Sequence, residues 1–205
     1  NSAFDIVCKN DKVYMIIGGK DLLNGKRFDK GGYILTYDYD KWSFIDPKEA
    51  QKKLNLPRNP RDYTSIAVTT DDSNDEIVYA SSMGDGVIQY KNGTPVQSYN
   101  EKNAFKETAG GYGSGYCYID GLAFDKNGNL WMTSSEVNHA VLVLDKAGAW
   151  HRLDIEQLRG VYTINDILIT STNDKWIYVP RNTPKLVMIP NSESLDEVSS
   201  CEFTT

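Results

Sequence analysis

Two positions in the sequence combine acidic and amide side chains in a way that could hold a metal ion. Asp120 comes just before one apolar run, and Asn165-Asp166 come just before another. Carboxylate and amide oxygens are preferred ligands of Ca²⁺, and carboxylates also bind Zn²⁺. If the two runs are neighbouring strands, these side chains converge and Ca or Zn could be bound. The alternative is structural, because such side chains often cap turns or bind nearby backbone.

Cationic side chains form a second set of candidate ligand-binding residues. Arg58, Arg61 and Arg181 lie in segments predicted to connect strands, where they could meet an anionic partner. His139 lies in another such segment, and no partner is identifiable for it from spacing. Ordinary solvated surface charge is the alternative interpretation of the arginines.

The segment GGYGSGY, residues 110–116, is the most distinctive loop of the chain. Glycine lets the backbone approach a ligand closely, and the rings of Tyr112 and Tyr116 could stack on sugars or bases. No Lys-Ser or Lys-Thr pair follows the glycines, so this is not a phosphate-binding loop. A flexible or tightly turning connection is the alternative.

Composition and missing motifs argue against several functional classes. The net charge of -6 disfavours a nucleic-acid surface, which needs a basic stripe. No apolar run approaches the roughly 18 residues that span a bilayer. There is no Gly-x-Ser-x-Gly, no histidine-containing zinc motif and no Cys-x-x-Cys. The three cysteines cannot all pair, which favours thiols but leaves one disulfide open. The start at Asn1 suggests a mature protein or a piece of a longer one.

The strands that must position these residues follow a repeat. Four segments share an apolar run, a turn containing Asn, and a second run with an aromatic residue. Asn, Asp and Gly tolerate positive φ, so each segment predicts a β-hairpin. The four turns are Asn10-Asp11, Asn74-Asp75, Asn127-Gly128 and Asn173-Asp174, and the aromatic markers are Tyr14, Tyr79, Trp131 and Tyr178.

Each hairpin is followed by a third and a fourth apolar run, which predicts four four-stranded antiparallel blades. The expected architecture is an all-β β-propeller in one domain, 1–205, with blades at about 4–45, 63–99, 119–153 and 164–205. A β-sandwich is less favoured, because it gives no reason to repeat one hairpin four times. Short helices are expected at Pro47–Leu56 and within 154–160, both in connections between blades.

The meander places the short turns at one edge of each blade and the long connections at the other, here named the turn edge and the loop edge. Long connections on a rigid frame usually carry function. All eight candidate ligand-binding residues, Arg58, Arg61, Tyr112, Tyr116, Asp120, His139, Asn165 and Arg181, belong to the loop edge.

The third predicted blade carries a recognisable motif. Asp120 to Met132 reads DGLAFDKNGNLWM, and a strand ending Val143-Leu144-Asp145 follows. This resembles the blades of two-component regulator propellers, found in sensor regions of hybrid histidine kinases, and the N-terminal propeller of PorZ-type proteins of the Bacteroidetes type IX secretion system. The match is good over Ile119–Leu153, whereas blades one and two lack the Gly-Asn-Leu-Trp core. The motif is also similar to blades of gluconolactonase-type, metal-dependent propellers.

These resemblances imply two hypotheses. The first is a non-catalytic propeller in the periplasm or at the cell surface, without cofactor, that binds a protein or glycan ligand as a sensor or as a secretion component. The alternative is a metal-dependent lactonase using Asp120, Asn165 and Asp166. Regulator-type blades usually occur in larger rings, so completion by further blades or by a homodimer is also expected.

Overall fold

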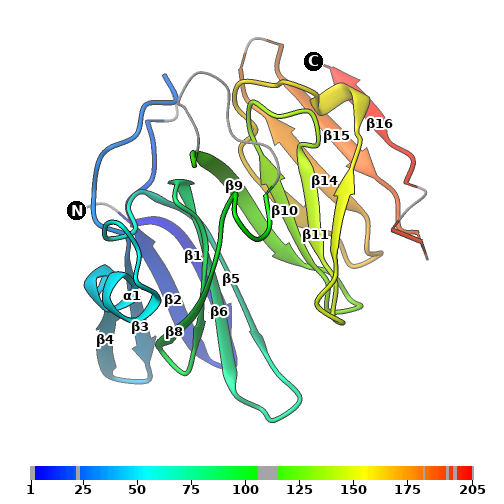
Figure 1. The fold of residues 1–205 in the computed structure, drawn as a ribbon. Coiled ribbons are helices and arrows are strands. Elements are labelled where there is room, and N and C mark those ends of the chain that lie inside the picture. Colours follow the sequence, from blue (N-terminus) through cyan, green and yellow to red (C-terminus); the bar gives the residue numbers. More distant parts are fainter. Residues whose placement is uncertain are drawn as a thin grey trace.

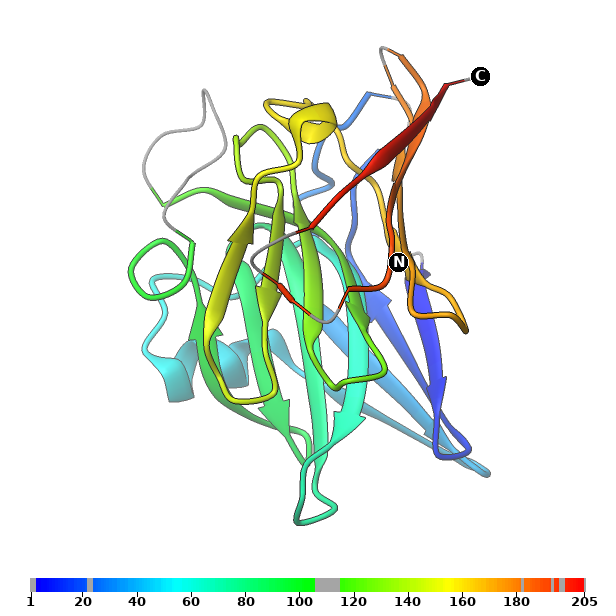
Figure 2. The ribbon, with the colours of Figure 1, turned by 90° about the vertical axis from the view of Figure 1, so that its right-hand side faces the viewer.

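The computed structural model describes residues 3–21, 24–105, 115–181, 183–192, 194–195 and 198–204. Within these residues, sixteen strands form four consecutive meanders, whose arrangement Figures 1 and 2 show. Blade 1 contains β1 (Ala3–Lys9), β2 (Lys12–Ile17), β3 (Tyr33–Asp38) and β4 (Lys41–Ile45). Blade 2 contains β5 (Tyr63–Thr70), β6 (Glu76–Gly84), β7 (Gly86–Lys91) and β8 (Thr94–Tyr99). Blade 3 contains β9 (Cys117–Phe124), β10 (Leu130–Ser134), β11 (Val141–Leu144) and β12 (Trp150–Leu153), and blade 4 contains β13 (Ile167–Ile169), β14 (Lys175–Val179), β15 (Lys185–Ile189) and β16 (Cys201–Thr204).

The hairpin turns have the backbone conformation that their residues favour. Asn10 and Asp11 connect β1 to β2 with φ values of 52° and 59°, and Asn173 before β14 has a φ of 70°. Gly128, before β10, has a φ of 84°. Because these residue types tolerate left-handed backbone, the predicted turns form where the sequence places them. The expected all-β propeller blades are confirmed.

The blades pack face to face, so each has a preceding face, toward the blade before it, and a following face, toward the next. Side chains alternate between the two faces along every strand. Tyr14, Ile16 and Ile34 on the following face of blade 1 pack against the preceding face of blade 2. Two further apolar clusters fill the junctions between blades 2 and 3 and between blades 3 and 4. The core therefore consists of three successive layers between blades.

Blades 2 and 3 are also joined by backbone pairing. At the loop edge β6 pairs with β9 through Met83 opposite Tyr118 and Gly84 opposite Cys117. The strands of both blades thus belong to one curled sheet in the order β12-β11-β10-β9-β6-β7-β8, with β5 beside β6. Figure 1 shows the two blades meeting at the top and diverging toward the turn edge at the bottom.

One expected aromatic marker is wrong by two residues. Tyr79 lies opposite Ala67 and Trp131 opposite Ala123, each on the following face of its blade. In blade 4 the same position, opposite Leu168, is held by Trp176 rather than Tyr178. Residues two apart on a strand share a face, so the repeat rhythm alone did not distinguish them.

The predicted helices form in the connections. Helix α1 (Pro47–Leu54) begins after Asp46, whose Oδ1 accepts a hydrogen bond from Lys48 N at 2.9 Å. It ends at Asn55, whose φ of 51° is left-handed. A 3-10 turn spans Glu156–Leu158. Among the described residues, no helix combines the length and the apolarity needed to cross a membrane.

Candidate functional site

The described parts of the loop that follows β2, residues 18–21 and 24–31, lie along the loop edge and come close to all three other blades. Its Arg27 Nε donates to Asp62 Oδ2 beside blade 2 at 3.0 Å. Its Lys20 pairs with Asp120 in blade 3. A Cβ at Gly25 would stand 3.0 Å from Nη1 of Arg181, which follows β14 of blade 4. The loop therefore ties the loop edge together across the arc.

Lys20 and Asp120 form a buried ion pair at the centre of this edge. Both side chains are almost completely buried, 1% and 0% exposed, which is rare for a lysine. The Lys20 ammonium also donates to Ile164 O at 3.3 Å and lies 5.0 Å from the centre of the Tyr118 ring. Ser135 Oγ donates to Asp120 and accepts from Ile164 N at 2.8 Å. Burial raises the pKa of the Asp120 carboxyl to about 6, against the opposing effects of Lys20 and Ser135.

The candidate metal ligands do not gather around an open position. The Lys20 ammonium occupies the place beside Asp120 where a bound cation would have to lie. Asp166 uses one carboxylate oxygen to accept from Ile167 N at 2.8 Å, and the backbone N–H of Asn165 donates to Tyr178 O at 2.9 Å. Across the part of the chain that the structure describes, no three His, Cys, Asp or Glu residues form a group suited to a metal. The donor set of Asp120, Asn165 and Asp166 therefore does not fit Ca or Zn well.

Asp62 anchors the crossing loop on its other side. The fully buried carboxylate accepts from the backbone N–H groups of Asp29 at 3.1 Å and Lys30 at 2.9 Å, besides Arg27 Nε. Burial by itself would lower the pKa of the Arg27 guanidinium. The negative charges around it, Asp62 above all, raise this pKa by more, so the net shift is upward. Three charge-assisted hydrogen bonds converge on one carboxylate, so this end of the loop is rigidly held.

Arg58 and Arg61 both bind Asp85, in the short connection between β6 and β7. Arg58 Nε and Nη2 lie 2.9 and 2.8 Å from Asp85 Oδ1. The backbone N–H of Arg61 donates to Asp85 Oδ2 at 3.0 Å, while its guanidinium reaches Asp29 at 3.4 Å. Both arginine side chains are almost half exposed, 45% and 44%, so their free faces remain available to a ligand.

Beside this pair lies a hollow of about 470 Å³, here named the loop-edge hollow. Its walls carry an aromatic ring, Tyr116, together with acidic, basic and amide side chains. Glu101 accepts from the backbone N–H of Gly115 at 2.5 Å and so fixes the approach to Tyr116. The lining residues are Leu56, Pro57, Arg58, Pro60, Gly84, Asp85, Asn100, Glu101, Lys102, Gly115 and Tyr116.

The remaining sequence candidates are dispersed. Arg181 stacks on the ring of Tyr162 at 5.8 Å, at the blade 4 end of the loop edge. His139 is half-buried and lies near Asp154, whose pKa falls mainly through its hydrogen bond with Arg159 and less through His139. Tyr112 lies outside the described residues. Of the eight candidates, the structure brings Arg58 and Tyr116 to one hollow and places Arg61 next to them through Asp85.

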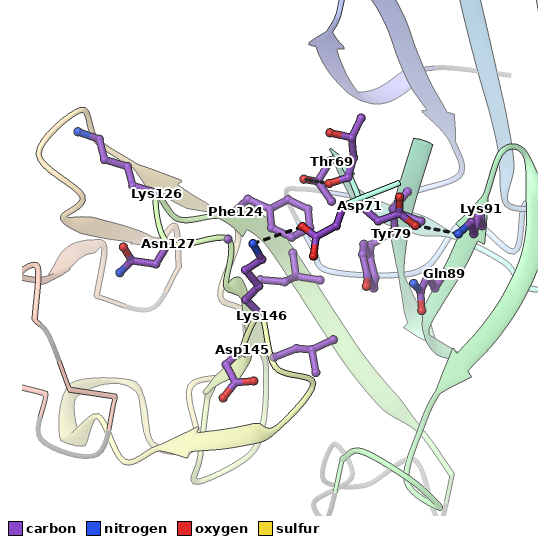
Figure 3. Close-up of a pocket in the computed structure, with 16 residues that line it drawn as sticks. Thr69, Asp71, Tyr79, Gln89, Lys91, Phe124, Lys126, Asn127, Asp145 and Lys146 are labelled. Atoms are coloured by element: carbon purple, nitrogen blue, oxygen red, sulfur yellow. Dashed lines mark hydrogen bonds and ion pairs between the residues drawn. The ribbon is translucent and has the colours of Figure 1, made fainter. Parts of the chain in front are cut away.

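A larger groove, about 540 Å³, opens at the turn edge between blades 2 and 3, where sequence reasoning expected short turns alone (Figure 3). Its floor is apolar and aromatic, with the Tyr79 and Phe124 rings 5.9 Å apart at 67°. Its rim carries paired charges: Lys91 binds Asp71 at 2.8 Å, and Lys146 reaches Asp72 at 3.5 Å. Two of the rim cations, Lys91 and Lys146, are therefore already paired with acids of this chain, whereas Lys126 donates to Ser171 O.

Several site residues were missed from the sequence. Lys20, Asp62, Asp85 and Glu101 all lie within connections assigned to the loop edge, so their location could be predicted but not their partners. The available signal was an acid directly after or before a strand, as at Asp62 and Asp85. Nothing in the local sequence distinguishes Lys20 from a solvated surface lysine.

The comparisons with known proteins show which fold this chain has, but they do not show a family to which it belongs. No family model matches the chain, and no curated protein matches it. Among solved structures, PorZ, an essential surface component of the type IX secretion system of Porphyromonas gingivalis, is 19% identical with a TM-score of 0.77. The match covers 97% of this chain and 27% of PorZ.

Two further structures show the same arrangement. The extracellular domain of the putative hybrid two-component system BT4673 from B. thetaiotaomicron is 15% identical, with a TM-score of 0.65, over 100% of this chain and 24% of that one. Streptogramin B lyase is 15% identical, with a TM-score of 0.56, over 99% of this chain and 54% of the lyase. This chain thus spans about a quarter of the length of the first two proteins. It shares its fold with β-propellers, PorZ and two-component extracellular domains among them.

Proposed function

We propose that this chain is a non-catalytic ligand-binding part of an extracytoplasmic β-propeller, and that the loop-edge hollow is its binding site. The hollow carries the proposal: it combines the ring of Tyr116 with half-exposed Arg58 and with Asp85, Asn100 and Glu101. An aromatic ring beside planar polar side chains suits a sugar ring or a polar protein segment. A net charge of -6 disfavours nucleic acid as the ligand.

The extracytoplasmic role rests on the fold. PorZ is described as a bacterial surface component of type IX secretion, and the BT4673 match is an extracellular domain of a two-component system. We infer that this chain acts in the periplasm or at the cell surface, as a sensor region or as a secretion component. Its ligand is then a glycan or a protein.

The test is a binding screen with a panel of defined oligosaccharides, followed by isothermal titration calorimetry of each oligosaccharide that binds. We expect Tyr116→Ala and Arg58→Ala to weaken binding by about 10-fold or more, since each removes a main wall of the hollow. Lys126→Ala, at the turn edge, is the matched control and should leave affinity unchanged. A ligand whose affinity survives both hollow substitutions would refute the assignment of the site, and a panel without any binder would favour a protein ligand.

The metal-dependent lactonase alternative has weaker support. Streptogramin B lyase shows that an enzyme can share this fold, but Lys20 already neutralises Asp120. Under this hypothesis the purified chain binds Ca²⁺ or Zn²⁺ stoichiometrically, and Asp120→Asn abolishes that binding. Elemental analysis with calcium and zinc titration decides the matter, and an absence of stoichiometric metal would exclude the alternative.

A further inference from the structure

The groove at the turn edge between blades 2 and 3 lies at the opposite edge from the loop-edge hollow and takes no part in the function proposed above. Its volume of about 540 Å³ falls within the range of sites for small organic ligands, roughly 300–1,000 Å³. The floor is apolar and is supplied by both blades, through Ile77, Tyr79, Phe124, Leu130 and Leu144. The apolar part of a ligand would therefore be covered from two sides.

Two aromatic rings and one amide group line the inner part of the groove. The rings of Tyr79 and Phe124 meet edge to face, with centres 5.9 Å apart. Gln89 of β7 also lines the groove, and the Tyr99 hydroxyl donates to its Oε1 at 2.9 Å, which holds the side chain in place. An amide can both donate and accept, so this combination suits a ligand that carries apolar side chains and a peptide group.

The charges around the groove cancel. Two of the acids are held by contacts within the chain, since Asp71 lies 2.8 Å from the Lys91 ammonium and Asp145 lies 3.0 Å from Nε2 of His151. The Lys126 ammonium points away from the groove in Figure 3 and donates to Ser171 O. In total the lining contains three acids and three lysines: Asp71, Asp72, Asp145, Lys91, Lys126 and Lys146. Such a lining favours a ligand without net charge.

Asp72 and Lys146 face each other across the mouth of the groove. Asp72 belongs to the turn of blade 2, and Lys146 belongs to the turn between β11 and β12 of blade 3. Lys146 Nζ lies 3.5 Å from Asp72 Oδ1, and the side chains are 68% and 94% exposed. So exposed an ion pair contributes little to stability, so each member can exchange the other for a charge of a ligand. The mouth thus offers one acid and one cation, on opposite walls.

We propose that this groove binds a short peptide with free ends and apolar side chains. The ammonium of the peptide pairs with Asp72, its carboxylate pairs with Lys146, and its side chains lie on the apolar floor. A simple anion or cation would satisfy one wall and leave the other, whereas a neutral sugar would use neither charge. Because an extended chain advances by roughly 3.3–3.6 Å per residue, about two or three residues fit between the walls.

The first test is isothermal titration calorimetry with leucyl-phenylalanine and with trileucine. Ligand concentrations of up to about 5 mM make dissociation constants of about 1 mM measurable. Each peptide is compared with its N-acetyl, C-amide and doubly capped derivatives. A single cap removes one charge and should weaken binding by about 10-fold or more, and the doubly capped peptide should not bind measurably. No binding of either free peptide, or equal binding of the free and doubly capped forms, would overturn the proposal.

Substitutions at the mouth then locate the site. Asp72→Ala and Lys146→Ala should each weaken binding of the free peptide by about 10-fold or more, because each removes the partner of one end. Lys126→Ala is the matched control: it removes a lysine from the same lining, but one whose ammonium binds Ser171 O. Its affinity should be unchanged. Peptide binding that survives both substitutions at the mouth would overturn the location.

Combining the variants with the capped peptides tests which end meets which wall. Lys146→Ala should bind the free and the amidated peptide equally but still discriminate against the acetylated one, and Asp72→Ala should show the reverse. The opposite pattern would overturn the proposed arrangement. Tyr116→Ala, in the loop-edge hollow, should leave peptide affinity unchanged, so the outcome is separate from that of the proposed function. A loss of peptide binding in Tyr116→Ala would place the peptide in the loop-edge hollow and overturn this inference.

Discussion

The junction between blades 2 and 3 and the junction between blades 3 and 4 contain the same kind of hairpin turn, but the acid of each turn binds a different side chain. At the turn edge Asp71 and Asp125 hold their hairpins alike: Asp71 Oδ1 accepts from Ser73 and Asp75, and Asp125 Oδ1 from Asn127 and Asn129, all at 2.9 Å. Asp125 Oδ2 then binds the indole N–H of Trp131 at 2.9 Å, whereas Asp71 Oδ2 binds Lys91 on the rim of the groove.

The consequence is that the junction between blades 3 and 4 keeps only a hollow of about 280 Å³ at the turn edge, whereas the groove between blades 2 and 3 measures about 540 Å³. Trp131 fills the first, with the Lys175 ammonium 4.5 Å from the centre of its ring. In the second, Tyr79 contacts Phe124 and Tyr99 instead, and the groove remains. The two junctions also differ at the loop edge: Lys20, from the loop of blade 1, binds both Asp120 of blade 3 and Ile164 O ahead of blade 4, whereas a short ladder joins blades 2 and 3. Identical turns thus give different junctions, because one aromatic residue reaches the turn acid and the other does not.

The largest loss of stability is expected from breaking the buried ion pair between Lys20 and Asp120 at the loop edge. Lys20→Met leaves the Asp120 carboxylate buried without its cation, and should lower the free energy of unfolding by about 3–5 kcal/mol at neutral pH. The double variant Lys20→Met/Asp120→Asn should recover much of that loss. Urea unfolding measures both, and a Lys20→Met chain as stable as the unmodified one would show that the pair does not hold this junction.

The same pair gives a pH signature. The pKa of Asp120 rises from 3.8 in the unfolded chain to about 6 in the folded chain, so the folded state binds the proton more tightly between these values. Its contribution to the free energy of unfolding is therefore full below pH 3.8 and is lost as pH rises toward about 6, by about 3 kcal/mol. The difference in stability between the unmodified chain and Asp120→Asn, measured from pH 4 to pH 7, should show this decline. A difference that is constant with pH would contradict it.

A smaller effect separates the two turns directly. Asp125→Ala deprives the Trp131 indole and the Asn129 amide of a buried acceptor, and should cost about 1–3 kcal/mol. Asp71→Ala removes the same two backbone contacts, but the partly exposed Lys91 keeps its pair with Asp75 at 2.8 Å, so the effect should be clearly smaller. Urea unfolding of both variants tests the comparison, and equal losses would mean that Trp131 does not depend on the turn acid.

The smallest effect is expected at the mouth of the groove. Lys146 and Asp72 face each other at 3.5 Å with side chains 68% and 94% exposed. Such pairs contribute little to stability, so Lys146→Ala should unfold at the same urea concentration as the unmodified chain. A clear destabilisation would show that the groove is more tightly closed than its geometry indicates.

The repeat made most of the fold predictable. Turn residues such as Asn10-Asp11 and Gly128 mark positive φ directly, and strand alternation follows from period two. Pro47 at the first turn and the good helix formers after it located helix α1. These signals are local, so one sequence suffices to interpret them.

The candidate site was less predictable because its contacts are distant along the chain. Lys20 and Asp120 lie 100 residues apart, and a lysine in a loop usually points to solvent. The metal hypothesis placed Asp120 correctly at the loop edge, but it could not anticipate a cation supplied by blade 1. Likewise, Trp176 and Tyr178 share one strand face, and cross-strand register was needed to assign the repeat.

The loop that crosses from blade 1 also constrains the order of folding. Lys20 contacts Ile164 O, 144 residues later, so this bond cannot form until the ribosome has synthesised blades 2 and 3 and the start of blade 4. Contacts of such sequence separation form late, since the intervening chain must first be ordered. Blade 1 therefore leaves the ribosome before the partners of the Lys20 ammonium have been synthesised. Docking of its loop onto blades 3 and 4 is then a late step in the packing of the four blades.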